Sequence, residues 1–311
     1  METRDRKVLI TGSTGFIGRL LIRRLLDEGH SLRCLVRREA AGIPDGPEIV
    51  RGDLLQPLTL GPVLEGVDTA YYLVHSMSGG RAGFKRRDRE AAENFVAAAE
   101  KSGVRRVIYL GGLGEAGDDL SEHLKSRLEV ADILRSGTFL TTFLRAAVII
   151  GAGGASFEMI KALVERLPVM ITPRWVSTRC QPIAVDDVIA YLAGCLMDDR
   201  TAGKTFDIGG PEVLTYREMM ERFGRIKGRN LFILSVPVLT PRLSSYWVGL
   251  ITPVPPSVSM PLIEGLNNEV ICRDSALREI LPLRLTPFDE AVHKALANNR
   301  FPGADKQDKM S

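Results

Sequence analysis

The sequence contains only four cysteines, and none of them lies near another. Cys34, Cys180, Cys195 and Cys272 are separated by long stretches, so no C-x-x-C pair is available to hold zinc or to exchange disulfides. We therefore expect buried thiols, no metal site and no disulfide framework, as is usual in a reducing compartment.

Long apolar runs and blocks of one charge are also missing. No apolar stretch reaches the roughly 18 residues of a membrane-spanning helix, and prolines interrupt the nearest approach, residues 246–258. The charged N-terminus leads directly into an apolar run, unlike a signal peptide. The formal charge is only +3, with basic and acidic residues mixed, so a nucleic-acid partner is not expected. These absences predict a cytoplasmic protein.

Short apolar runs alternate with helix-length amphipathic segments. The expected strands are Lys7–Thr11, Ser31–Val36, Glu48–Arg51, Thr69–Val74, Arg106–Leu110, Phe139–Arg145 and Thr205–Ile208. The expected helices are Phe16–Glu28, Phe84–Ser102, His123–Arg135, Phe157–Arg166 and Asp186–Met197. Because strands separated by helices need crossover connections, the pattern predicts an α/β fold with a doubly wound parallel sheet of the Rossmann type.

The alternation of strands and helices weakens in the second half of the chain. Residues 1–150 are predicted to form the main sheet domain, to which residues 183–210 return. Proline and glycine become more frequent elsewhere, which indicates a smaller C-terminal lobe built from residues 151–182 and 211–299. The polar residues 300–311 are expected to form a flexible tail.

A glycine-rich turn separates the first expected strand from the first expected helix. It consists of Gly12, Ser13, Thr14, Gly15, Phe16, Ile17 and Gly18. Gly12 suits a tight bend, Gly15 allows the backbone to approach a pyrophosphate, and Gly18 lets the helix pack on the strand. The helix N-terminus then offers free N–H groups to phosphate. We therefore predict dinucleotide binding here.

The residues after the second strand indicate which dinucleotide binds. An acidic residue at this position would bind the ribose hydroxyls of NAD, whereas an arginine accommodates the 2′-phosphate of NADP. Arg37 and Arg38 stand there, so the sequence favours NADP(H) over NAD(H). The alternative is that both arginines are solvated and that Glu39 contacts the ribose.

Further cofactor contacts are expected where later strands end, because ligands collect at the carboxyl ends of parallel strands. The expected residues are Asp53, Leu54, Val74, His75, Ser76, Gly111 and Gly112. The carboxylate of Asp53 can accept a hydrogen bond from an adenine amino group, unless it only caps a surface turn. His75 suits either a cofactor or substrate contact or a structural hydrogen bond.

With these residues in place, the chain resembles the extended and atypical short-chain dehydrogenase/reductase superfamily, which includes the NAD-dependent epimerase/dehydratases. Residues 11–18, 52–54, 181–188 and 206–219 look like that group in the same order, over residues 7–225. More narrowly, the chain is similar to the NmrA-like branch and to the related NAD(P)-binding subunit of respiratory complex I. That resemblance implies NADP(H) binding, often without known turnover.

The resemblance fails at the catalytic residues. The superfamily relies on a Tyr-x-x-x-Lys pair, in which the lysine lowers the pKa of the tyrosine, and on a serine that polarises the same substrate oxygen. Here His123 and Arg127 stand at the tyrosine and lysine positions, and Gly111 and Gly112 lie in the serine segment. Histidine can exchange protons near neutral pH, and arginine can bind the nicotinamide ribose. The alternative is that both are exposed polar residues on a helix.

The C-terminal lobe contains the residues that the resemblance places near substrate. Arg174, Trp175 and Gln181 are the expected substrate contacts, because an aromatic plane beside arginine suits an anionic or aromatic ligand. Packing between the lobes with surface arginines is the alternative. The apolar, proline-rich segment Leu231–Pro261 is best explained as a lid or core, less well as a partner interface, and least well as a membrane contact.

Three functions are compatible with this sequence. The first is an NADP(H)-dependent oxidoreductase or epimerase-like enzyme that acts on an unknown small organic substrate, with His123 as proton donor. The second is a non-catalytic NADP(H)-binding redox sensor or assembly factor. The third is a scaffold that has lost dinucleotide binding. The oligomeric state is open, and a homodimer is allowed.

Overall fold

A seven-stranded parallel sheet forms the centre of the molecule. The computed structural model describes residues 6–38, 42–74, 81–114, 122–235, 254, 263, 265–266 and 268–298. The strand order is β11-β6-β5-β4-β1-β2-β3, and every neighbouring pair is parallel. The strands are β1 (Lys7–Ile10), β2 (Leu32–Val36), β3 (Glu48–Arg51), β4 (Val67–Tyr72), β5 (Arg106–Gly112), β6 (Leu140–Ala146) and β11 (Thr205–Ile208). The predicted doubly wound α/β fold is therefore confirmed.

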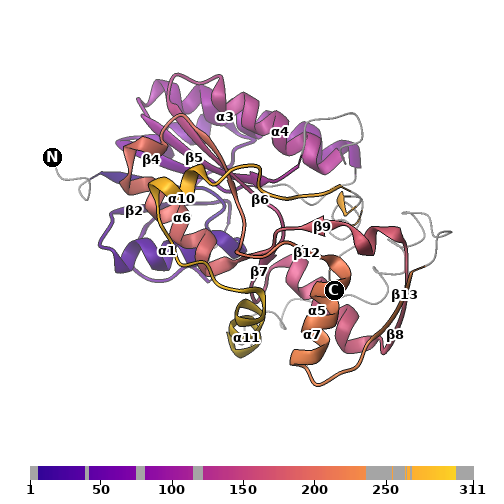
Figure 1. Cartoon of the computed structure of the whole chain (residues 1–311). Coiled ribbons are helices and arrows are strands. Elements are labelled where there is room, and N and C mark those ends of the chain that lie inside the picture. Colours follow the sequence, from indigo (N-terminus) through magenta and orange to yellow (C-terminus); the bar gives the residue numbers. More distant parts are fainter. Residues whose placement is uncertain are drawn as a thin grey trace.

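Helices cover both faces of this sheet (Figure 1). One face packs against α1 (Phe16–Asp27) and α6 (Val185–Met197), whose apolar residues share one core cluster. The other face packs against α2 (Leu60–Leu64), α3 (Arg81–Lys101) and α4 (Glu122–Arg135). Because both faces are covered, the central strands are buried on both sides, which explains their continuous apolar runs.

A second group of elements packs beside the sheet around its own apolar core. Its helices are α5 (Ala155–Arg166), η3 (Arg174–Ser177), α7 (Tyr216–Ile226) and α11 (Phe288–Asn298). Its strands form three small sheets, which pair β7 (Ile149–Ile150) with β10 (Ile183–Ala184), β9 (Arg179–Cys180) with β12 (Leu214–Thr215), and β8 (Val169–Thr172) with β13 (Phe232–Ser235). The lobe limits expected from the sequence stay a prediction, and residues 300–311 lie outside the described residues.

Polar contacts hold α11 against the rest of the described structure. The carboxylate of Asp187, in α6, accepts hydrogen bonds from the backbone N–H of Thr286 at 2.8 Å and from its hydroxyl at 3.0 Å. Arg222, in α7, contacts Glu212 and Asp289, 2.6 Å and 2.8 Å away. These bonds fix the start of α11 against α6 and α7. Within the described ranges, no helix is both long enough and apolar enough to cross a membrane.

Candidate functional site

The glycine-rich turn lies between β1 and α1, at the carboxyl end of the sheet. Gly12 has a φ of +66°, and a Cβ atom at this position would lie 2.6 Å from the carbonyl oxygen of Leu73. A Cβ atom at Gly18 would lie 2.3 Å from the carbonyl oxygen of Gly12. Only glycine therefore allows the turn to approach β4 while α1 packs against the turn.

The N-terminus of α1 is open to an anion. Gly15 is the N-cap residue, no side chain caps the helix, and its first turn contains no acidic residue. The first N–H groups of a helix need partners and carry the positive end of the helix dipole. The turn therefore fits the pyrophosphate of a dinucleotide. Ser13 is buried and donates a hydrogen bond to the carbonyl oxygen of Leu35 at 2.7 Å, which ties the turn to β2.

Three guanidinium groups lie around the segment that follows β2. Arg37 and Arg38 are exposed, and no ion pair joins either of them to the described part of the chain. Arg19, which the sequence analysis missed, extends from α1 toward Gly42, where a Cβ atom would lie 2.9 Å from its Nη1. The basic character predicted for this position is present, and Glu39 lies outside the described residues.

The other expected cofactor contacts differ in their surroundings. Asp53 accepts a hydrogen bond from the backbone N–H of Leu55 at 3.0 Å, so one oxygen of its carboxylate caps a turn. Within the described ranges, the other oxygen accepts no hydrogen bond from the protein. Leu54 is buried and Val74 is half-buried just beyond β4. His75 and Ser76 fall outside the described residues.

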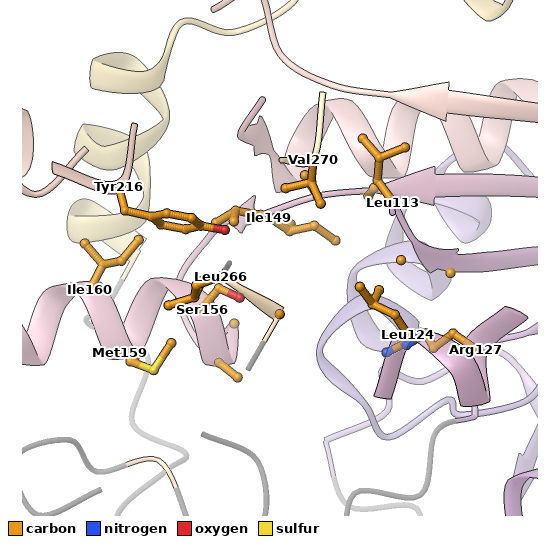
Figure 2. A pocket seen from close by; sticks show the side chains of 18 of the residues that line it. Leu113, Leu124, Arg127, Ile149, Ser156, Met159, Ile160, Tyr216, Leu266 and Val270 are labelled. Carbon is orange, nitrogen blue, oxygen red and sulfur yellow. The ribbon is translucent and has the colours of Figure 1, made fainter. Parts of the chain in front are cut away.

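A cavity of about 290 Å³ opens where β4, β5 and β6 end, between α1 and the second group of elements (Figure 2). Its walls are mainly apolar, and Arg127 is the single charged side chain among the described residues that line it. The polar side chains in the same lining are Ser156, Trp175 and Tyr216. The cavity suits an apolar ligand with few polar groups.

The serine and lysine positions of the superfamily meet at one end of this cavity. A Cβ atom at Gly111 would lie 2.4 Å from the ring of Phe143, and one at Gly112 would lie 2.9 Å from Leu124. A side chain at Gly111 would therefore require the Phe143 ring to move, whereas only the flexible end of Leu124 would have to move at Gly112. Arg127 donates a hydrogen bond from Nη1 to the carbonyl oxygen of Leu110 at 3.3 Å, and its side chain points to this end of the cavity (Figure 2).

His123 belongs to the first turn of α4, one helical turn before Arg127. Its side chain is outside the described structure, so its predicted role as proton donor stays a prediction.

Two aromatic residues line the opposite end of the cavity. The rings of Trp175 and Tyr216 are 5.9 Å apart and nearly perpendicular. Burial, and then the neighbouring Cys180 thiol, raise the pKa of the Tyr216 hydroxyl well above its ordinary value, so the hydroxyl is neutral. Figure 2 shows Tyr216 extending between Ile160 and Ile149. Sequence reasoning found Trp175 but missed Tyr216 and Ser156, which have no motif of their own.

Gln181 is not among the described residues that line this cavity. The amide of Gln181 donates to the carbonyl oxygen of Gly210 at 2.7 Å and accepts from the backbone N–H of Cys272 at 3.0 Å. Gln181 lines a separate, polar cavity of about 320 Å³ together with Asp207. The backbone of Arg174 lies in η3, while its side chain is outside the described structure.

Comparison with known proteins adds independent findings. Residues 12–152 match a family model described as NAD(P)H-binding. The photosystem II assembly factor Ycf39 of Synechocystis sp. is 27% identical over 241 residues, which covers 75% of this chain and 71% of that protein. The chloroplastic divinyl chlorophyllide a 8-vinyl-reductase of Arabidopsis thaliana is 26% identical over 257 residues, or 76% of this chain, and the chain spans only 61% of that reductase.

A solved structure extends the comparison to the fold. The triphenylmethane reductase of Citrobacter sp., complexed with NADP(H), matches with a TM-score of 0.74 at 20% identity, over 93% of this chain and 99% of that one. This likeness shows the fold. The family match confirms a nicotinamide-dinucleotide-binding segment at the level of NAD(P)H, and it does not distinguish NADP from NAD.

Proposed function

We propose that this chain is an NADP(H)-dependent reductase of an apolar small molecule. Its residues 12–152 match a family model described as NAD(P)H-binding, which supports the cofactor part of the proposal. The apolar cavity beside the glycine-rich turn carries the proposal. In open α/β sheets, ligands bind at the carboxyl ends of the strands, and apolar walls select the apolar body of a ligand.

The residues around the turn would hold the cofactor. The pyrophosphate would bind at the N-terminus of α1, beside the turn that contains Gly12, Gly15 and Gly18. The 2′-phosphate would be bound by Arg37 and Arg38. Two exposed guanidinium groups favour NADP(H) over NAD(H), in keeping with the NADP(H) complex of the triphenylmethane reductase. When bound, this cofactor supplies or accepts a hydride at its nicotinamide ring.

The chain's own residues would orient and polarise the substrate. The guanidinium of Arg127 lies at the end of the cavity nearest β5, where it would stabilise negative charge on a substrate oxygen. The neutral hydroxyl of Tyr216 would donate a hydrogen bond from the far end. His123 would supply the proton, as the sequence predicts, because imidazole exchanges protons near neutral pH. The apolar walls would exclude water.

Kinetics across a panel of apolar ketones, quinones and conjugated alkenes test this function. We expect substrate-dependent oxidation of NADPH, loss of turnover in His123→Ala and Arg127→Met, and unchanged NADPH affinity in His123→Ala. His293→Ala, at an exposed histidine of α11, is the matched control and should keep full activity. Wild-type turnover in His123→Ala would remove that residue from the mechanism.

A non-catalytic NADP(H)-binding redox sensor or assembly factor is the second candidate. The tight packing at Gly111 and Gly112 favours it, because the hydroxyl group used by the superfamily has no counterpart there. The similarity to an assembly factor points the same way. This function predicts NADPH binding without oxidation by any member of the panel, a result that would overturn the reductase.

A further inference from the structure

The small sheet formed by β8 and β13 has apolar side chains on both of its faces. The strands pair in parallel register, with Val169 opposite Phe232 and Ile171 opposite Leu234. The residues between them, Met170 and Ile233, are buried in the core beside the main sheet. The other four side chains face solvent and have these exposed fractions: Val169 55%, Ile171 52%, Phe232 63% and Leu234 48%. We call these four residues the β8–β13 patch.

This patch is unusual for a strand pair at the surface. A sheet with one solvated face normally alternates apolar and polar residues, whereas all four outward positions here are large and apolar. Cross-strand neighbours lie side by side, so the four side chains form one continuous surface. Figure 1 places β8 and β13 at the edge of the molecule away from the main sheet. A contiguous exposed apolar patch of this kind marks a contact surface.

A basic turn borders the patch. Arg225, Lys227 and Arg229 are exposed and stand immediately before β13. Lys227 contacts the carboxylate of Glu165 at 3.0 Å, and Arg229 donates a hydrogen bond to the carbonyl oxygen of Glu165. The turn therefore lies at the end of α5, directly before β8.

The same end of the strand pair is fixed by the backbone, since the N–H of Phe232 donates to the carbonyl oxygen of Pro168 at 3.0 Å. Lys227 and Arg229 thus lie next to the start of both strands of the patch, and Arg225 precedes them in the last turn of α7. Glu165 is the one acidic residue that the described contacts place against the turn, so the turn retains net positive charge.

We propose that the β8–β13 patch docks this protein on the surface of an anionic lipid bilayer. The apolar side chains would enter the boundary between headgroups and acyl chains, while Arg225, Lys227 and Arg229 would contact the anionic headgroups. An apolar face bordered by lysine and arginine is the pattern of interfacial anchors. The sequence made membrane contact the least favoured role for Leu231–Pro261, because it does not reveal that Phe232 and Leu234 face solvent.

A second copy of the chain fits the patch less well. In a twofold contact, the patch would meet itself and bring two positively charged turns around the same apolar surface. Within the described contacts, Glu165 is the acidic residue of each copy that is placed to offset that repulsion. Charge complementarity therefore favours an anionic bilayer over self-association.

Vesicle flotation of the full chain tests the proposal. We expect the protein to bind vesicles of phosphatidylcholine and phosphatidylglycerol mixed equally, more weakly at high salt, and far more weakly to phosphatidylcholine alone. Phe232→Asp and Leu234→Asp should each reduce binding by at least roughly tenfold. Each variant loses a large apolar side chain whose transfer from water into the bilayer would favour binding. Leu58→Asp, at a 97% exposed leucine in η2 (Pro57–Thr59), is the matched control and should bind as the wild type does.

The basic turn is tested separately from the apolar residues. Arg225→Ala should reduce binding to the mixed vesicles by about fivefold, while Arg284→Ala, at an exposed arginine before α11, should not. Equal binding by the wild type, Phe232→Asp and Leu234→Asp would overturn the proposal. The proposal would also be overturned if the wild type failed to float with vesicles and instead sedimented as a dimer that Phe232→Asp abolishes. NADPH binding by every variant shows that each one is folded.

Discussion

At the scale of single residues, the three glycines of the cofactor turn are required for different reasons. Gly12 needs its left-handed backbone, Gly18 lacks space for any side chain, and a Cβ atom at Gly15 would lie 3.1 Å from the carbonyl oxygen of Gly12. The sequence assigns these roles from spacing alone, because the strand, turn and helix are contiguous. It does not reveal that the peptide of Leu73, far along the chain, supplies the crowding at Gly12.

Replacing Gly12 by alanine should therefore abolish cofactor binding and destabilise the chain. Its positive φ costs an alanine roughly 1–2 kcal/mol, and the clash with the Leu73 carbonyl adds about 1–3 kcal/mol of strain. Gly66→Ala is the matched control, since Gly66 has a φ of +71° but nothing within 4 Å of an added Cβ. Denaturant unfolding and NADPH titration measure both effects. Equal stability losses in the two variants would show that crowding at Gly12 is unimportant.

At the scale of elements, contiguous patterns were predictable and distant pairings were not. The inner strands of the main sheet follow from short apolar runs separated by helices, because burial on both faces leaves a strong local signal. Helix α7 was missed, although Thr215 and Glu218 form a capping box that the sequence contains. The pairing of β8 with β13 joins segments about sixty residues apart, and nothing local indicates it.

Asp187 allows a test of the contacts that hold α11. Removing its carboxylate in Asp187→Ala leaves the buried N–H and hydroxyl of Thr286 without their acceptor, which should cost about 1–3 kcal/mol of unfolding free energy. Asp186→Ala, at the adjacent exposed carboxylate, is the control and should change stability little.

The stability difference between wild type and Asp187→Ala should also depend on pH. Burial raises the folded-state pKa of Asp187 above its ordinary value of 3.8, so the folded state holds this proton more tightly than the unfolded state does. The contribution of Asp187 is therefore largest below the ordinary pKa and decreases as pH rises through the raised pKa. Denaturant unfolding from acidic to neutral pH measures it. A difference that grows with pH would contradict this assignment.

At the scale of the whole molecule, the cavity exists only because distant segments converge. Arg127 comes from α4, Ser156 from α5 and Tyr216 from α7, so no local pattern joins them. Trp175 lines the cavity, as its position beside arginine suggested. The hydrogen bonds of the Gln181 amide go to backbone groups far along the chain, which no local pattern reveals. The glycine-rich turn was predictable from contiguous residues, and the lining of the apolar cavity was not.

Cofactor binding should be visible in the stability of the whole chain. A ligand at about 100 times its dissociation constant adds roughly 2.7 kcal/mol to the unfolding free energy, which is a rise of several degrees in Tm for a chain of this size. We expect NADPH to raise Tm more than NADH at equal concentration, because only NADPH offers a 2′-phosphate to Arg37 and Arg38.

In the double variant Arg37→Ala/Arg38→Ala, the rise in Tm with NADPH should fall to that with NADH, and the affinity for NADPH should be reduced roughly tenfold or more. Arg284→Ala should retain the full difference. Equal losses for both cofactors would show that these arginines do not bind the 2′-phosphate, and no shift with either cofactor would favour a scaffold that has lost dinucleotide binding.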